Sequence, residues 1–133
     1  MTMFSSRIWR EVPQRYRREA IKFKKSGLSF YPPRQVDPTN GDTDGELVVL
    51  PETGKVLTYT VIRVAPGMWG DQSPYALAVV ELTDGTKVMA QMTDVDVEQV
   101  KIGMEVRMEF RRLQTESHEG VLSYAHKAVP KWY

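Results

Sequence analysis

The stretch "KVMAQMTDVDVEQVKIGMEVRMEF", Lys87 to Phe110, decides the fold of this chain. Its first and last parts alternate apolar and polar residues, which is the pattern of a β-strand with one buried face. The central "TDVDVEQVKIG" opens on Thr93 and Asp94, two residue types that cap helices, and it predicts a short helical turn. In the second strand we expect these residues to face the interior: Met104, Val106, Met108 and Phe110.

Three further strands extend the pattern on both sides. "KVLTYTVIRVA" (55–65) and "YALAVVEL" (75–82) precede the stretch, and "GVLSYAHKAV" (120–129) follows it. Alternation assigns these residues to one face of the first strand: Val56, Thr58, Thr60, Ile62 and Val64. Five short strands with a helical element between the third and the fourth predict a mainly β protein built on a five-stranded OB-fold barrel.

The N-terminal part is predicted to be separate from the barrel. "DPTNGDTDGE" is a turn-rich linker, so we expect residues 1–45 to form one unit and residues 46–133 to form the barrel domain. The spacing of Phe4 and Ile8 predicts a short helix that ends at Pro13. Residues 13–25 fit either a second helix closed by Gly27 or a hairpin, and the pattern alone does not decide between them.

Composition and charge limit the classes of function that this chain can have. The chain has 133 residues, of which 41% are hydrophobic, and it has no apolar run near the roughly 18 residues of a membrane span. The first residues lack the apolar core of a signal peptide, so we expect a cytoplasmic protein with no membrane segment. Residues 1–34 hold nine basic and two acidic residues, whereas the remainder holds nine basic and fifteen acidic. A cationic N-terminal part can meet a phosphate, a nucleic acid or an acidic protein face.

The segment "KFKKSGLSFYPPRQVDPTNG", residues 22–41, has the residue spacing of a zinc site but lacks the usual zinc ligands. Two short steps, Phe23 to Ser26 and Asp37 to Asn40, each run into a glycine, as the paired ligands of a zinc knuckle do. The chain has no cysteine, and this excludes disulfides and thiolate metal sites.

The same segments resemble a known family. "PQRYRREAIKFKKSGLSFYPPRQVDP" and "AQMTDVDVEQVKIGMEVRMEFRRL" are similar to OB-fold, acyl-CoA-associated accessory proteins that carry an N-terminal rubredoxin-like zinc ribbon. The resemblance to this domain-of-unknown-function family runs from about Trp9 to Pro130. For residues 16–31 it favours a hairpin rather than a helix. The positions of the ribbon cysteines are occupied here by Phe23, Ser26, Asp37 and Asn40. We therefore expect a degenerate ribbon that binds no zinc, with Phe23 packing in place of the metal and Asp37 and Asn40 bonding to their own turns.

The resemblance also implies a function. Members accompany thiolase-type enzymes, so the expected role is a non-catalytic scaffold subunit in a hetero-oligomeric acyl-CoA-processing complex. Its partner would be a thiolase-like or hydroxymethylglutaryl-CoA synthase-like catalytic subunit, or a related acyltransferase. No catalytic residue is assigned to this chain, and a coenzyme A thioester is expected only in the complex. The residues proposed to dock the partner are Trp9, Tyr16, Tyr31, Pro32, Pro33 and Trp69. The residues proposed to meet coenzyme A phosphates are Arg34, Lys25 and Lys127.

Two other classes compete with the scaffold interpretation. Single-stranded nucleic-acid binding is a frequent OB-fold function, but it needs a cationic barrel groove with aromatic residues, and the barrel half of this chain is acidic. A stand-alone enzyme needs a nucleophile, a base and an orienting group. The only histidines are His118, in a polar turn, and His126, which we interpret as a residue on a barrel face.

Overall fold

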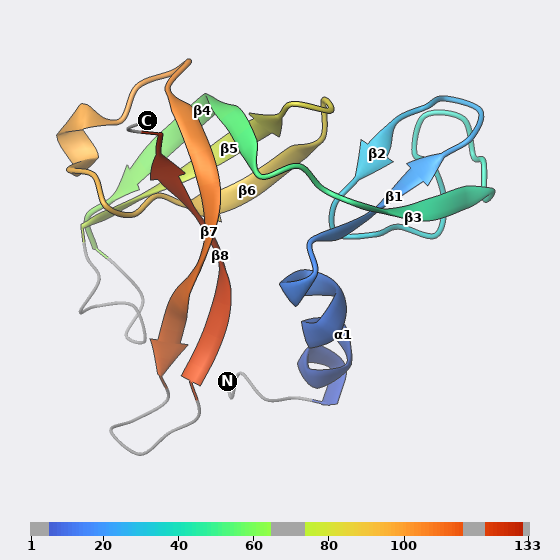
Figure 1. The fold of residues 1–133 in the computed structure, drawn as a ribbon, viewed down its shortest axis with the longest axis horizontal. Coiled ribbons are helices and arrows are strands. Elements are labelled where there is room, and N and C mark those ends of the chain that lie inside the picture. The colour runs from blue at the N-terminus through green and yellow to red at the C-terminus, as the bar shows by residue number, and fades with distance from the viewer. Residues whose placement is uncertain (1–5, 65–73, 116–121, 132–133) are drawn as a thin grey trace.

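The structure is a computed structural model, and it describes residues 6–64, 74–115 and 122–131. One helix and two antiparallel sheets make up this part of the chain (Figure 1). A three-stranded sheet and the helix lie on one side, and a five-stranded sheet curls into a barrel on the other. No helix among the described residues has the length and apolar character needed to cross a membrane.

The five-stranded sheet is the predicted OB-fold barrel. Its strands run in the order β6 (Lys87–Gln91), β5 (Tyr75–Leu82), β4 (Thr53–Ile62), β7 (Glu105–Thr115) and β8 (Leu122–Pro130). The first and last strands meet at a parallel bridge between Met92 and Ala128, which nearly closes the barrel. The short 3-10 helix η2 (Val97–Gln99) lies between the third and fourth barrel strands, as predicted.

The barrel interior is filled by small and branched apolar side chains. Val56, Val80 and Val106 are almost fully buried at its centre. A β-bulge between Val56 and Thr58 inserts Leu57 into strand β4 and reverses the faces that follow. The prediction that one face runs unbroken from Val56 to Val64 is therefore wrong: Val61 packs on the core, and Val64 is exposed.

The N-terminal part is a three-stranded sheet, here called the ribbon. β1 (Glu19–Phe23) pairs antiparallel with both β2 (Ser29–Phe30) and β3 (Gly45–Val49). This confirms the predicted hairpin, with its strands between residues 19 and 30, and excludes a helix over that part of residues 13–25. The predicted boundary at residue 45 stays a prediction, but the strand directly after it pairs with β1 along its whole length instead of joining the barrel.

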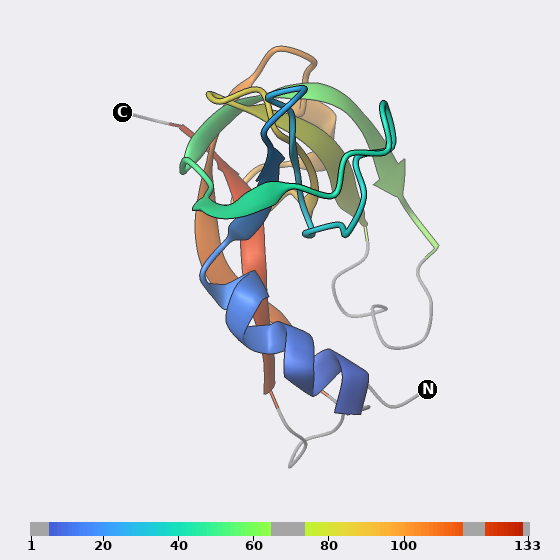
Figure 2. The ribbon, with the colours of Figure 1, turned by 90° about the vertical axis from the view of Figure 1, so that its right-hand side faces the viewer.

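Helix α1 (Ser6–Tyr16) continues through Pro13, where the sequence predicted its end. Proline in a helix removes one hydrogen bond, but the next turn still closes, because the Arg17 amide donates to the Pro13 carbonyl at 3.1 Å. The helix contacts β1 and β8, and this tertiary packing stabilises it past the proline. Figure 2 shows the helix running from the ribbon alongside the hairpin of β7 and β8.

Candidate partner-docking site

The two vacated knuckle steps fold into matching turns. The Gly27 amide donates to the Phe23 carbonyl, and the Gly41 amide donates to the Asp37 carbonyl, each at 2.9 Å. Both glycines have positive φ, 72° and 74°, a conformation in which a side chain would be strained. The two steps therefore form turns with the same hydrogen bond and the same glycine conformation, and these turns are called the two knuckles below.

A side-chain network joins the two turns. The Ser26 hydroxyl of the first knuckle donates to Asp37 Oδ2 of the second at 2.6 Å. The amide and hydroxyl of Thr39 donate to Asp37 Oδ1 at 2.9 and 2.7 Å. Burial raises the pKa of Asp37, but these hydrogen bonds lower it more, so the net pKa lies below its ordinary value. The carboxylate is therefore held ionised inside the ribbon.

The remaining vacated positions have structural partners as well. Phe23 is fully buried, with its ring 5.9 Å from that of Phe30. Asn40 Oδ1 accepts from the Asp42 amide at 2.9 Å, and Asp42 in turn accepts from the amides of Lys25 and Asp44. These contacts confirm the expected packing of Phe23 and the expected local bonding of Asp37 and Asn40.

This donor set does not fit zinc. A structural zinc site needs four thiolate, imidazole or carboxylate ligands, whereas the four positions offer a phenyl ring, a hydroxyl, an amide and one carboxylate already engaged in hydrogen bonds. Nowhere in residues 6–64, 74–115 and 122–131 do three or more His, Cys, Asp or Glu side chains gather as a metal site would require.

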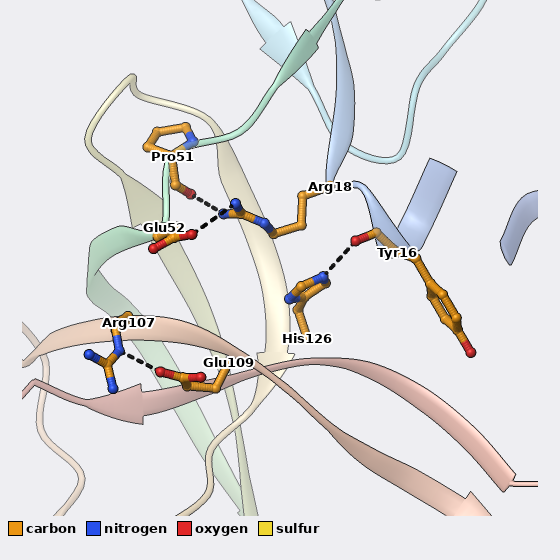
Figure 3. Close-up of polar contacts among 7 residues, drawn as sticks. All are labelled: Tyr16, Arg18, Pro51, Glu52, Arg107, Glu109 and His126. Atoms are coloured by element: carbon orange, nitrogen blue, oxygen red, sulfur yellow. Dashed lines mark hydrogen bonds and ion pairs between the residues drawn. The ribbon is translucent and has the colours of Figure 1, made fainter. Parts of the chain in front are cut away.

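A groove of about 510 Å³ separates the ribbon from the barrel. We call it the junction groove; it is lined by Tyr16, Arg17, Arg18, Val49, Glu52, Met108, Glu109, Phe110 and His126. Its walls come from the end of α1, from the end of the ribbon sheet where β1 begins and β3 ends, and from β7 and β8 (Figure 3). The groove thus lies where three parts of the chain meet.

An aromatic cluster forms the barrel side of the junction groove. Phe110 lies 4.9 Å from the ring of Tyr16, 5.2 Å from Tyr124 and 5.3 Å from His126, between ring centroids. The prediction that Phe110 faces the barrel interior is wrong, since it is substantially exposed. The reason is that β4 pairs with β7 only as far as Arg107, so beyond that residue the β7–β8 hairpin extends past the barrel and meets the helix.

Arg18 fixes the ribbon to the barrel. Its guanidinium donates to the Pro51 carbonyl at 3.0 Å and contacts Glu52 at 3.4 Å, while its own carbonyl accepts from the Leu50 amide at 2.9 Å (Figure 3). Its φ of 54° is left-handed, which costs a residue with a Cβ about 1–2 kcal/mol. The contacts hold a strained turn that ends the helix and starts β1.

His126 makes a second tie between the helix and the barrel. Its Nε2 lies 3.0 Å from the Tyr16 carbonyl, which accepts the hydrogen bond (Figure 3). The side chain therefore serves a backbone contact, and it lies on the part of the β7–β8 hairpin that extends past the barrel rather than on a barrel face as predicted.

The proposed docking residues are not equivalent. Tyr16 exposes part of its ring beside the groove, whereas Tyr31 is half-buried against the core, where burial raises the pKa of its hydroxyl and Arg15 and Arg18 oppose that rise. Pro32 is exposed and Pro33 is half-buried. The side chain of Trp9 and the whole of Trp69 lie outside the described residues.

The three residues proposed to meet coenzyme A phosphates differ in their exposure to solvent. Arg34 and Lys25 are exposed on the ribbon, and the Arg34 guanidinium lies 5.2 Å from the centroid of the Phe30 ring. Lys127 lies on β8 and is only 6% exposed. Burial, followed by the charges of Arg112 and Arg111, lowers its pKa. As folded, Lys127 does not offer its ammonium to a phosphate in solution.

Sequence reasoning missed two features of this region. The junction of Tyr16, Phe110 and His126 joins residues more than ninety positions apart, and no local pattern signals it. The exposed face of β3, with Leu47 and Val49, was not predicted because "ELVVL" was assigned to the barrel.

Comparison with known proteins identifies the family. The family described as ChsH2, C-terminal OB-fold domain, matches residues 47–111. A DUF35 domain-containing scaffold protein of Methanocaldococcus jannaschii is 36% identical over 125 residues, which cover 93% of this chain and 89% of that protein. Another, from Methanothermobacter thermautotrophicus, is 38% identical over 127 residues, which cover 94% and 95%. The chain belongs to the DUF35 scaffold-protein family.

Two further similarities bear on this DUF35 protein. A probable enoyl-CoA hydratase alpha subunit of Thermomonospora curvata is 31% identical over 80 residues, which cover 60% of this chain and 25% of that protein. A solved structure described as "Ltp2-ChsH2(DUF35) aldolase" covers 98% of both chains with a TM-score of 0.70 and 23% identity. At that identity the likeness shows the fold alone, and it extends over the ribbon as well as the barrel.

Proposed function

We propose that this DUF35 protein is a non-catalytic scaffold subunit that docks a separate catalytic subunit of an acyl-CoA-processing complex. The observation that carries the proposal is the similarity, over nearly the whole chain, to proteins named as DUF35 scaffold proteins. An accessory role in a larger assembly follows from that similarity.

The geometry supports docking rather than catalysis. The functional groups of the junction are engaged in holding the ribbon, helix and barrel together: Arg18 bonds to Pro51, and His126 bonds to the backbone at Tyr16. These contacts hold the ribbon, the helix and the barrel in one arrangement, so a partner would meet surfaces that are already ordered. A scaffold needs such pre-organised surfaces, because ordering them on binding would reduce affinity.

The acyl-CoA part of the proposal rests on the names of similar proteins and on the reactions that the proposed partner enzymes catalyse. One relative is named as a subunit of a probable enoyl-CoA hydratase, and the solved structure of the same fold is described as an aldolase that pairs Ltp2 with a DUF35 chain. A thiolase-like or hydroxymethylglutaryl-CoA synthase-like partner is the proposed catalytic subunit, since those enzymes make or break carbon–carbon bonds in acyl-CoA thioesters. Of the three residues predicted to meet the phosphates of coenzyme A, Arg34 and Lys25 are the exposed ones, and they are the proposed contacts.

Affinity capture tests the docking claim. The tagged chain, expressed in its native host, should co-purify with a thiolase-like or synthase-like protein in a fixed ratio that survives gel filtration. Recovery of the chain alone, or with nucleic acid that salt removes, would overturn the proposal.

A second measurement tests the coenzyme A contact. In the captured complex, the double substitution Arg34→Ala and Lys25→Ala should weaken acetyl-CoA binding several-fold, because each removes a positive charge near the phosphates. Lys24→Ala is the matched control, since Lys24 is an equally exposed neighbour paired with Asp44. Unchanged affinity in the double variant would remove coenzyme A from the role of this chain but leave the docking claim intact.

A further inference from the structure

Strand β3 forms one edge of the ribbon, and its outer backbone groups belong to Gly45, Leu47 and Val49. The Leu50 amide donates to the Arg18 carbonyl and the Lys24 amide donates to the Asp44 carbonyl, so the even-numbered residues of β3 bond to β1. In an antiparallel ladder, the alternate residues then direct their N–H and C=O groups away from the partner strand. The sheet order places no strand on that side among the described residues.

The same residues expose apolar side chains. Leu47 is 62% exposed and Val49 is 67% exposed, and alternation puts both on one face of β3. Natural edge strands are usually protected by lysine, proline or a bulge. β3 contains no lysine and no proline, and its register with β1 has no irregularity. An edge that lacks lysine, proline and a bulge and that exposes apolar side chains is the form of a strand-accepting site, and its only charged side chain within β3 is Glu46.

Charge argues against a second copy of this chain as the occupant. Three antiparallel registers bring the outer residues of two copies together: Leu47 with Leu47, Leu47 with Val49, or Val49 with Val49. They bring Glu52 of one copy toward Asp42, Asp44 or Glu46 of the other, respectively. Like charges placed opposite each other destabilise a strand pair.

The same acidic residues favour a basic segment as the occupant of this edge. Asp44 lies 3.5 Å from Lys24, Glu46 lies opposite Lys22 in the β1–β3 register, and Glu52 lies 3.4 Å from the mostly buried Arg18. Pairs that solvent reaches on at least one side contribute little, so these carboxylates can still attract an added positive charge. Residues 44–52 contain three acidic and no basic residues. An incoming strand with Lys or Arg at its ends would complement this edge.

We infer that the free edge of β3 accepts an extended segment of about five residues as a fourth ribbon strand, apolar at alternate positions and basic at its ends. That this segment belongs to the catalytic subunit rests on the proposed function. That the edge of β3 accepts a strand does not rest on it. The partner's apolar side chains would pack on Leu47 and Val49, beside the junction groove that Val49 also lines.

A peptide experiment tests the edge directly. The probe is the blocked peptide Lys-Val-Thr-Val-Thr-Val-Lys, with Glu-Val-Thr-Val-Thr-Val-Glu as its acidic twin, and the readout is amide hydrogen exchange by NMR. The basic peptide should slow exchange at Leu47 and Val49 about tenfold or more at saturation, because their amides gain acceptors. The Val48 amide, already directed toward β1, is the internal control and should change little. No slowing at Leu47 and Val49, or equal slowing by the acidic twin, would overturn the inference.

A charge-reversed variant separates this inference from the proposed function. Asp44→Lys combined with Glu46→Lys leaves the junction residues untouched and should reverse the preference to the acidic peptide. It should also lose the protein that the native chain captures. If the native chain captures a catalytic subunit and the variant captures it equally well, the edge is not the docking site, and the proposed function stands. If the basic peptide protects the edge but the native chain captures no catalytic subunit, the inference stands and the proposed function fails.

Discussion

Replacing Phe23 by alanine tests whether apolar packing stabilises the ribbon in place of a metal. The ring is fully buried in the ribbon beside that of Phe30, and truncating such a ring costs about 3–5 kcal/mol. Phe23 is outside the apolar cluster that joins the barrel to Ala20 and Leu50, so the loss falls on the ribbon alone. The opening equilibrium of the ribbon should therefore rise by roughly two to three and a half orders of magnitude.

Amide hydrogen exchange by NMR resolves this local effect. Exchange at Gly27 and Gly41, whose amides close the two knuckles, should accelerate by that factor. The Leu82 amide, bonded to the Thr86 carbonyl in the barrel, should keep its rate. Phe23→Leu is the matched control and should cost about 1 kcal/mol, because it keeps most of the apolar volume. Equal acceleration at Leu82 and Gly27, or none at Gly27, would refute the reasoning.

Four further predictions follow from the site. The depressed pKa of Asp37 stabilises the folded ribbon above its ordinary value of 3.8, and that stability should be lost as the pH falls below 3.8 toward the folded pKa. Asp37→Asn should abolish this part of an acid-unfolding curve, and an unchanged curve would contradict the assignment. Arg18→Gly should be more stable to urea than Arg18→Ala by about 1 kcal/mol, since both lose the side-chain contacts and only alanine keeps the left-handed strain. Equal stability would argue against strain at this turn. The pKa of Lys127 lies below its ordinary 10.5, so the unfolded chain binds more protons just below pH 10.5, and stability should rise with pH there. Lys127→Met should remove that rise, as measured by urea titration at several pH values. Metal analysis should find no stoichiometric zinc, and chelator should leave the melting temperature unchanged, whereas a chelator-induced drop would show a structural metal.

The barrel could be predicted from sequence because its signal is local. Alternating apolar residues mark each strand, and residues such as Val80 and Val106 lie in the interior as their pattern indicates. Departures occur where a distant strand decides the environment. The bulge at Leu57 reverses the faces of β4, and the loss of the β4 partner beyond Arg107 turns Phe110 toward the helix.

The ribbon shows the same limit. "ELVVL" has the composition of a barrel strand, and its residues give no indication that it pairs with β1. Pro13 predicted a helix end, but packing on β8 carried the helix one turn further.

The sequence could predict the two matching turns because their spacing is local, and for the same reason it could predict the packing of Phe23 and the turn bonding of Asp37. The bond between Ser26 and Asp37 links two knuckles eleven residues apart, so it required the fold. The junction of Tyr16 with His126 lies beyond sequence reasoning for the same reason, since 110 positions separate the two residues.

The central claim, that this chain completes an acyl-CoA enzyme without being one, is tested most directly by reconstitution. Carbon–carbon bond formation or cleavage with acetyl-CoA and related thioesters would be measured for this chain, for the captured catalytic subunit, and for their mixture. The account predicts no turnover by this chain alone and a turnover by the mixture that exceeds that of the catalytic subunit alone. Turnover by this chain alone, or a mixture no different from the catalytic subunit, would contradict it.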